Sequence, residues 1–66
     1  MNIQINGQAQ VVREALPLSE LLQQLDLAGK RIAVEINEEL VPRSEHASYV
    51  LQPDDRVEIV QAIGGG

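Results

Sequence analysis

The chain has 66 residues, which is enough for one small domain, and it contains no cysteine, which excludes disulfides, thiolate metal ligands and a cysteine nucleophile. Ten acidic residues against five basic ones give a net charge of −5, which disfavours nucleic-acid binding and favours a basic partner surface. The N-terminal segment has no signal-peptide pattern, and no stretch approaches the roughly 20 apolar residues of a membrane span. We therefore expect a cytoplasmic domain with neither nucleic acid nor membrane as a partner.

The first eleven residues have the alternation of a β-hairpin. Apolar side chains occupy every second position on both sides of a turn, at Met1, Ile3, Ile5, Ala9 and Val11. Asn6-Gly7 is typical of a two-residue hairpin turn, but such a turn would pair Ile5 with Gln8 and mix apolar with polar side chains on each face. The pattern therefore predicts a three-residue loop that contains Gly7, with a local bulge.

Residues 17–27 are predicted to form the main helix. Their leucines recur at helical spacing and make one apolar face: Leu18, Leu21, Leu22 and Leu25. Pro17 fits the first helical turn, and Glu20 suits the positive N-terminal end of the helix dipole. Gly29 is expected to stop the helix.

The second half of the chain predicts three more strands. Residues 32–36 alternate like a half-buried strand, and a short edge strand around Leu40–Val41 ends at Pro42, which cannot donate to a sheet ladder. Ser44 is expected to cap a single helical turn over residues 44–47. A turn over residues 52–55 precedes the last strand, residues 56–63, in which Val57 and Ile59 face inward.

The predicted element order is β-β-α-β-β-β, with one amphipathic helix to cover one apolar sheet face. We expect an α+β fold, a β-grasp roll in which a mixed sheet of four to five strands packs on one main helix. The last strand pairs in parallel with the first at the sheet centre. Residues 1–63 form this domain, and residues 64–66 form a flexible C-terminal glycine tail.

Within the domain, the sequence offers few groups that could carry chemistry. His46 is the one histidine, and we interpret it as a solvated loop residue because no metal-ligand partners accompany it. The adjacent carboxylates Glu38-Glu39 and Asp54-Asp55 are interpreted as solvated turn residues. No catalytic triad, phosphate-binding glycine loop or zinc spacing is present in the sequence.

The three terminal glycines point to a function for the C-terminus. Glycine has no Cβ, so Gly64 and Gly65 suit a narrow channel in a partner, which would receive the carboxylate of Gly66. Activation with ATP would give a mixed anhydride with AMP, and a sulfur nucleophile would convert it to a thiocarboxylate. The alternative is an idle end, either frayed or left by cloning.

Three segments carry a family resemblance, namely "SELLQQLDL", "VEINEELVPRSEH" and "DDRVEIVQAIGGG". With them the whole chain resembles the ubiquitin-like sulfur carriers, and among these the ThiS family of thiamine (thiazole) biosynthesis. The N-x-x-L/I-V-P-R stretch, residues 37–43, is more specific than the glycines. Two departures are Pro17, where the family often has a Ser or Thr cap, and Pro53-Asp54-Asp55, where it often has Asp-Gly-Asp.

The resemblance implies that Gly66 is the residue that is adenylated and then thiocarboxylated. It implies an ATP- and zinc-dependent ThiF-type activating enzyme, a ThiG thiazole synthase as acceptor, and a sulfur donor such as a cysteine desulfurase. The chain itself would be a protein co-substrate and not an enzyme. It would bind no cofactor, and the ATP would be used by the activating partner.

The last strand also suggests a docking face. Val60 and Ala62 are expected on the exposed side of the sheet, ringed by Glu35 and Glu58, although isolated surface apolar residues need no function. Two other functions stay open at this point. One is a sulfur carrier for molybdopterin or another sulfur-containing product, and the other is a β-grasp interaction module that does not react.

Overall fold

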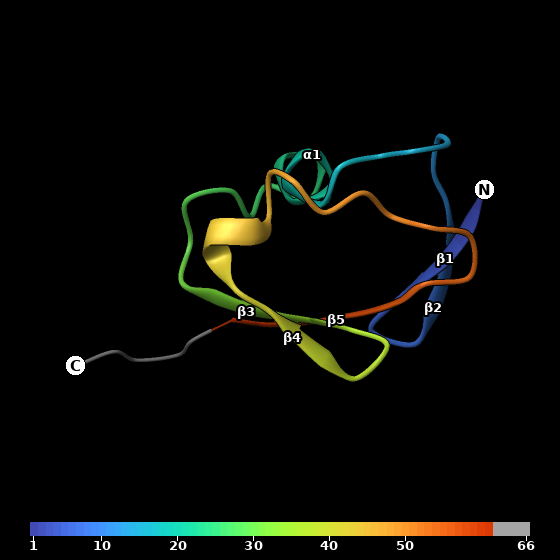
Figure 1. Cartoon of the computed structure of the whole chain (residues 1–66). Helices are drawn as coiled ribbons and strands as arrows, with labels where there is room; N and C mark the ends of the chain where they lie inside the picture. The colour runs from blue at the N-terminus through green and yellow to red at the C-terminus, as the bar shows by residue number, and fades with distance from the viewer. Residues whose placement is uncertain (62–66) are drawn as a thin grey trace.

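The computed structural model describes residues 1–61, and they form a five-stranded mixed sheet covered by one helix (Figure 1). In chain order the elements are β1 (Asn2–Ile5), β2 (Gln8–Val11), α1 (Leu18–Gln24), β3 (Ile32–Ile36), β4 (Glu39–Val41), the 3-10 helix η1 (Arg43–Glu45) and β5 (Arg56–Gln61). The strand order is β2-β1-β5-β3-β4; β1 and β5 are parallel, and the other neighbours are antiparallel. The predicted β-grasp roll is therefore confirmed, while the predicted boundary between residues 63 and 64 lies outside the described residues.

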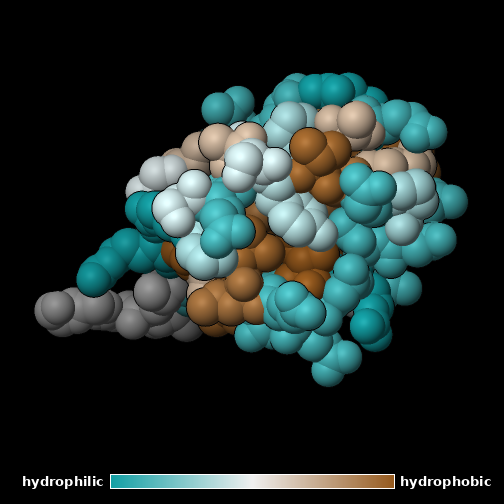
Figure 2. Space-filling view, in the orientation of Figure 1, coloured by the Kyte–Doolittle hydropathy of each residue, from teal (hydrophilic) through white to brown (hydrophobic). Residues whose placement is uncertain are grey.

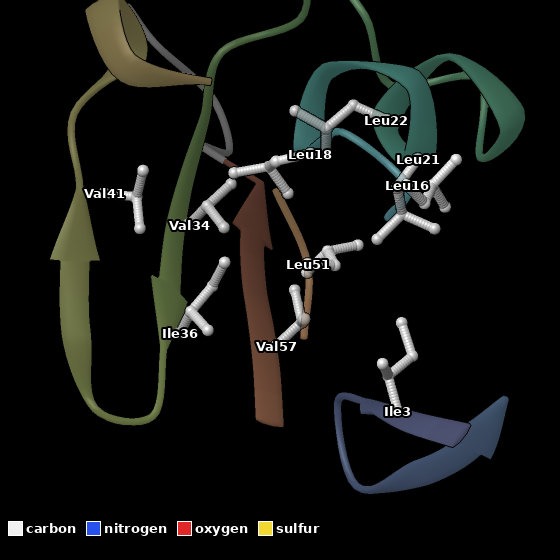
Figure 3. Packing of buried hydrophobic residues seen from close by; sticks show 10 residues of the cluster. All are labelled: Ile3, Leu16, Leu18, Leu21, Leu22, Val34, Ile36, Val41, Leu51 and Val57. Atoms are coloured by element: carbon white, nitrogen blue, oxygen red, sulfur yellow. The ribbon is translucent and has the colours of Figure 1, made fainter. Parts of the chain in front are cut away.

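One apolar core lies between the helix and the sheet (Figure 3). Ten hydrophobic side chains are buried there, at Ile3, Leu16, Leu18, Leu21, Leu22, Val34, Ile36, Val41, Leu51 and Val57. Burying one such side chain contributes about 1.5–3 kcal/mol, so this cluster is the main source of stability. No helix in this part of the chain is long and apolar enough to cross a membrane.

The helix begins without a side-chain cap, because its N-cap residue is Pro17. The first amide groups of a helix have no partner within it and need acceptors from elsewhere. Here the amide of Leu18 donates to the carbonyl of Tyr49 at 2.8 Å, and the amide of Ser19 donates to the carbonyl of His46 at 3.0 Å. The segment that follows η1 thus replaces the missing Ser or Thr cap.

The helix ends earlier than predicted, at Gln24, and its stop is Asp26 instead of Gly29. Asp26 takes a left-handed conformation with φ 61°, and two backbone bonds close a Schellman motif around it. The amide of Leu27 donates to the carbonyl of Leu22 at 2.8 Å, and the amide of Asp26 donates to the carbonyl of Gln23 at 3.0 Å. Gly29 also has positive φ, but it lies in the connection to β3.

The first hairpin differs from the prediction as well. Ile5 pairs with Gln8 and Ile3 with Gln10, so Asn6 and Gly7 form a two-residue turn, with φ values of 49° and 83° that fit a type I′ turn. The three-residue loop was wrong because β2 is exposed along its whole length. With no buried face on β2, mixed pairing of apolar and polar side chains has little cost.

The segment after β4 contains a third correction. Pro42 is the N-cap of η1, so Ser44 lies inside the short helix and does not cap it. β4 is a three-residue edge strand paired only with β3, as predicted from Pro42. Together these elements bring η1 to the same end of the sheet as the end of β5 (Figure 1).

Candidate functional site

The candidate site centres on the end of β5, because residues 62–66, which we call the glycine segment, follow this strand in the chain. Four predicted site residues lie outside the described residues, namely Ala62, Gly64, Gly65 and Gly66. The other two, Glu58 and Val60, are in β5 and are both exposed. The described part of the site is therefore the strand and the surface around it.

β5 is held on both of its edges. On one edge β3 pairs with it over five positions, from Ile36 opposite Val57 to Ile32 opposite Gln61. On the other edge β1 pairs only at the beginning of the strand, where Gln4 and Ile5 lie opposite Arg56 and Val57. The edge beyond Val57 would be open without a further partner.

The side chain of Asn6 supplies that partner. Its Oδ1 accepts a hydrogen bond from the amide of Ile59 at 2.8 Å, and its Nδ2 donates to the carbonyl of Ile59 at 3.3 Å. The amide of Asn6 also donates to the carbonyl of Val57 at 2.8 Å. Asn6 therefore extends the β1 edge by one residue pair. Sequence reasoning treated Asn6 only as a turn residue, since nothing in the local pattern indicates a contact 53 positions away.

The sheet face opposite the helix carries a small apolar area beside two glutamates. Val60 is 66% exposed and lies opposite Ala33, while Leu40 is 64% exposed and lies opposite Glu35. We call the set Ala33, Glu35, Leu40, Glu58 and Val60 the outer face. Sequence reasoning missed Leu40, although the alternation of β4 against buried Val41 was a signal for it. Figure 2, in the orientation of Figure 1, shows hydrophilic residues around the margin of the molecule and apolar residues exposed both above and below its centre.

Glu35 and Glu58 are direct cross-strand neighbours on this face. Residues opposed in this way have Cβ atoms about 4.5–5.5 Å apart, and like charges in such pairs are destabilising. Neither glutamate has an ion-pair partner within residues 1–61. The outer face thus combines exposed apolar side chains with two unneutralised negative charges.

Asp55 was predicted to be solvated, and the structure shows that this was wrong. It is only 5% exposed, and its carboxylate accepts three hydrogen bonds: from Asn37 Nδ2 at 3.0 Å, Tyr49 Oη at 3.2 Å and the Gln52 amide at 2.9 Å. Burial, followed by the nearby Asp55 carboxylate, raises the pKa of the Tyr49 hydroxyl above its ordinary value. This network joins the β3–β4 turn to the turn before β5 and is structural. Glu38, Glu39 and Asp54 are exposed, as predicted.

His46 was also predicted to be solvated, and it is instead 9% exposed. Its Nε2 lies 3.1 Å from the carbonyl oxygen of Val41, so the ring ties η1 to the end of β4. The bond needs a proton on Nε2 and leaves no base free at that nitrogen. Among residues 1–61, no group of three or more His, Asp or Glu side chains could hold a metal ion.

Comparison with known proteins agrees with this geometry. The family model described as "ThiS family" matches residues 2–66. The chain is 36% identical to the sulfur carrier protein ThiS of Escherichia coli over 66 residues, with both chains fully covered. It is 39% identical over 66 residues to a thiazole synthase of Magnetococcus marinus, in which the matching segment is 20% of the protein.

A solved structure shows the same likeness in three dimensions. The crystal structure of the thiamine biosynthesis protein ThiS from Geobacter metallireducens superimposes with a TM-score of 0.86 at 33% identity, and both chains are fully covered. Fold, full-length sequence match and family match therefore agree. The chain belongs to the ThiS family, as a small sulfur carrier protein and not an enzyme.

Proposed function

We propose that this chain carries sulfur for thiazole formation in thiamine biosynthesis on the carboxyl group of Gly66. In the first step a carboxylate oxygen of Gly66 attacks the α-phosphorus of ATP, and pyrophosphate leaves. In the second step a sulfur nucleophile attacks the carboxyl carbon of the mixed anhydride, and AMP leaves. When the nucleophile is the persulfide of a sulfur donor, its attack gives an acyl disulfide. A thiol then attacks the donor's sulfur and breaks the S–S bond, so that the terminal thiocarboxylate is released and a disulfide remains on the donor. The thiocarboxylate sulfur is passed to the acceptor.

The observation that carries the proposal is the position of β5. This strand lies in the middle of the sheet, held by β3 along its length and by β1 and Asn6 on its other edge. Gln61 is therefore placed by the sheet, and the glycine segment continues from it. A central strand gives a carrier a defined origin for the segment that enters a partner.

The described residues of the carrier bear on which protein performs the ATP chemistry. Residues 1–61 contain no cluster that could hold a metal ion, and the buried polar groups Asp55 and His46 are occupied by structural bonds. We therefore assign the ATP chemistry to a ThiF-type activating partner, and we propose that the carrier binds no cofactor. A cysteine desulfurase or a similar donor supplies the sulfur.

Two comparisons support the proposal that Gly66 carries the sulfur and that a thiazole synthase accepts it. The alignment with the Escherichia coli sulfur carrier covers both chains completely, so it includes Gly66. Thiazole synthases of two bacteria contain a segment similar to this chain as about a fifth of their length, 20% in each. Such an arrangement places a carrier domain beside a thiazole synthase, which supports a ThiG-type acceptor.

We further propose that the outer face docks on the activating enzyme. Val60 supplies exposed apolar area next to the origin of the glycine segment, and Ala62 is assigned to the same contact. Glu58, beside Glu35, supplies negative charge for a basic surface on the enzyme.

The test is ATP–pyrophosphate exchange by a ThiF-type enzyme with this chain as substrate. Deletion of Gly66 should abolish exchange and leave the melting temperature unchanged, because residues 1–61 hold the fold. The control is Asn2→Ala, an exposed change at the other end of the sheet, which should exchange like the wild type. Full exchange by the Gly66 deletion, or none by the wild type with several competent enzymes, would refute the carrier function.

A further inference from the structure

The basic side chains of this acidic protein are unevenly distributed. Of the five Lys and Arg residues, two form ion pairs with nearby glutamates, Arg13 with Glu20 and Arg56 with Glu38. The other three are exposed and have no ion-pair partner within residues 1–61; they are Lys30, Arg31 and Arg43, which we call the basic cluster. The unpaired lysine and arginine side chains of residues 1–61 therefore form one group.

The cluster is assembled from two separate segments of the chain. Arg43 Nη2 donates to the backbone carbonyl of Lys30 at 2.8 Å, which ties η1 to the turn before β3. Arg31 and Arg43 line the same surface hollow, whose other lining residues are Ile32, Ala33 and Val60. The arrangement is thus part of the fold and does not depend on sequence neighbours alone.

The cluster lies where β5 ends. The register places Ile32 opposite Gln61 and Ala33 opposite Val60, so Arg31 is next in sequence to the pair that closes the strand. The turn before β3 and η1 lie at this same end of the sheet (Figure 1). The basic cluster therefore stands at the origin of the glycine segment, and Glu35 and Glu58 lie further along the sheet from this end.

The length of the glycine segment determines which part of a partner the basic cluster can contact. Five residues follow Gln61, and a fully extended chain spans at most about 3.3–3.6 Å per residue, or roughly 17 Å in all. When the segment is extended in a partner, the carboxyl group of Gly66 is far from the cluster. The cations then face the entrance of the partner's channel, and the phosphates of ATP are beyond their reach.

We propose that the basic cluster binds carboxylate side chains around the channel entrance of the activating enzyme. The inference rests on the proposed carrier function and adds the chemistry of the partner surface. A net charge of −5 gives no attraction to an acidic surface, so a local group of cations is needed for such a contact. Opposite charges on the two sides of Val60 also define the orientation in which the carrier docks.

The test compares Arg31→Glu with Arg13→Glu. Both substitutions lower the net charge by the same amount, and both remove an exposed arginine, but Arg13 precedes the helix and is not in the cluster. We expect Arg31→Glu to raise the Kd for a ThiF-type enzyme by about tenfold, mainly through slower association, as for charges at an interface margin. Its kcat for pyrophosphate exchange should match the wild type at saturation. Melting curves of both variants verify that they fold.

Three results would overturn the inference. The first is equal binding by Arg31→Glu and Arg13→Glu, and the second is tighter binding by Arg31→Glu. The third is binding of ATP to the isolated carrier that Arg31→Glu abolishes, which would make the cluster a phosphate site. In each case the wild type still undergoes exchange, whereas failure of the carrier function itself appears as no exchange by the wild type.

Discussion

The opposed glutamates of the outer face provide a sharp prediction, because they should cost stability and contribute to binding. Glu35 and Glu58 lie opposite each other on adjacent strands. At a separation of about 6 Å in water, two unit charges repel by about 0.7 kcal/mol, and physiological salt reduces this to about 0.3 kcal/mol. Glu58→Lys converts the repulsion to attraction. The expected gain in the free energy of unfolding is therefore about 0.7 kcal/mol.

For a domain of this size, that gain corresponds to a rise in melting temperature of about 3–5 °C. Glu35→Lys should have a similar effect, since it changes the same pair. The double variant Glu35→Lys/Glu58→Lys restores two like charges and should melt near the wild type. Glu14→Lys, an exposed change outside the sheet, controls for the same change in net charge, from −5 to −3. The assay is thermal unfolding monitored by circular dichroism.

The same variants separate stability from docking. Glu58→Lys should bind the activating enzyme more weakly while it melts at a higher temperature, a combination typical of functional surfaces. The change in the free energy of unfolding of the double variant could instead equal the sum of the changes in the two single variants. That result would show that the two side chains do not interact, which contradicts the reasoning from register. A stabilised Glu58→Lys with unchanged affinity would remove Glu58 from the interface.

Three further predictions concern the turns and the hydrogen-bond network. Glu38→Gly should raise stability by about 1 kcal/mol, measured by thermal unfolding, because Glu38 has φ 70° and its ion pair is exposed. Tyr49→Phe should lower the free energy of unfolding by about 1 kcal/mol below pH 10, because it removes the hydrogen bond to Asp55. The pKa of Tyr49 is raised in the folded protein, so the stabilisation by its hydroxyl is present at low pH and is lost as pH rises, and the difference between variant and wild type should shrink above pH 10. A difference that stays constant with pH would contradict the assignment. Asn6→Gly keeps the turn and should speed amide exchange of Ile59 by up to about tenfold, with Asn2→Ala as the unaffected control.

Patterns within single segments were sufficient for most of the fold. Alternation identified β3 and β5 because both have one face on the core, where Val34 and Val57 are nearly inaccessible to solvent. The helix was found from leucines at helical spacing, and Pro42 indicated the edge strand. The parallel pairing of β1 with β5 was expected as part of a β-grasp roll, and the structure has it.

The errors arose where hydrogen bonds or burial, and not the residue pattern, decide the local structure. The three-residue loop assumed that β2 has a buried face, but β2 is at the sheet edge and all four of its residues are exposed. The helix stop was assigned to glycine, whereas Asp26 adopts the left-handed conformation because its neighbours complete the Schellman bonds. Asp55 and His46 are polar residues whose burial depends on partners that only the folded chain provides.

The candidate site divides in the same way. Exposure of Val60 and Glu58 follows from strand alternation against buried Val57. The role of Asn6 at the edge of β5 and the gathering of the basic cluster depend on contacts between segments far apart in sequence. Neither could be read from local patterns, because a turn asparagine, an adjacent Lys-Arg pair and a single further arginine are ordinary surface residues.

The most direct test of the central claim is the intact mass of the chain after incubation with a ThiF-type enzyme, ATP and a sulfur donor. The account predicts a mass gain equal to one oxygen replaced by one sulfur, located at Gly66 by fragmentation and lost on transfer to a thiazole synthase. The Gly66 deletion should gain no mass. An unchanged mass with several competent activating enzymes, or sulfur located at a residue other than Gly66, would contradict the account.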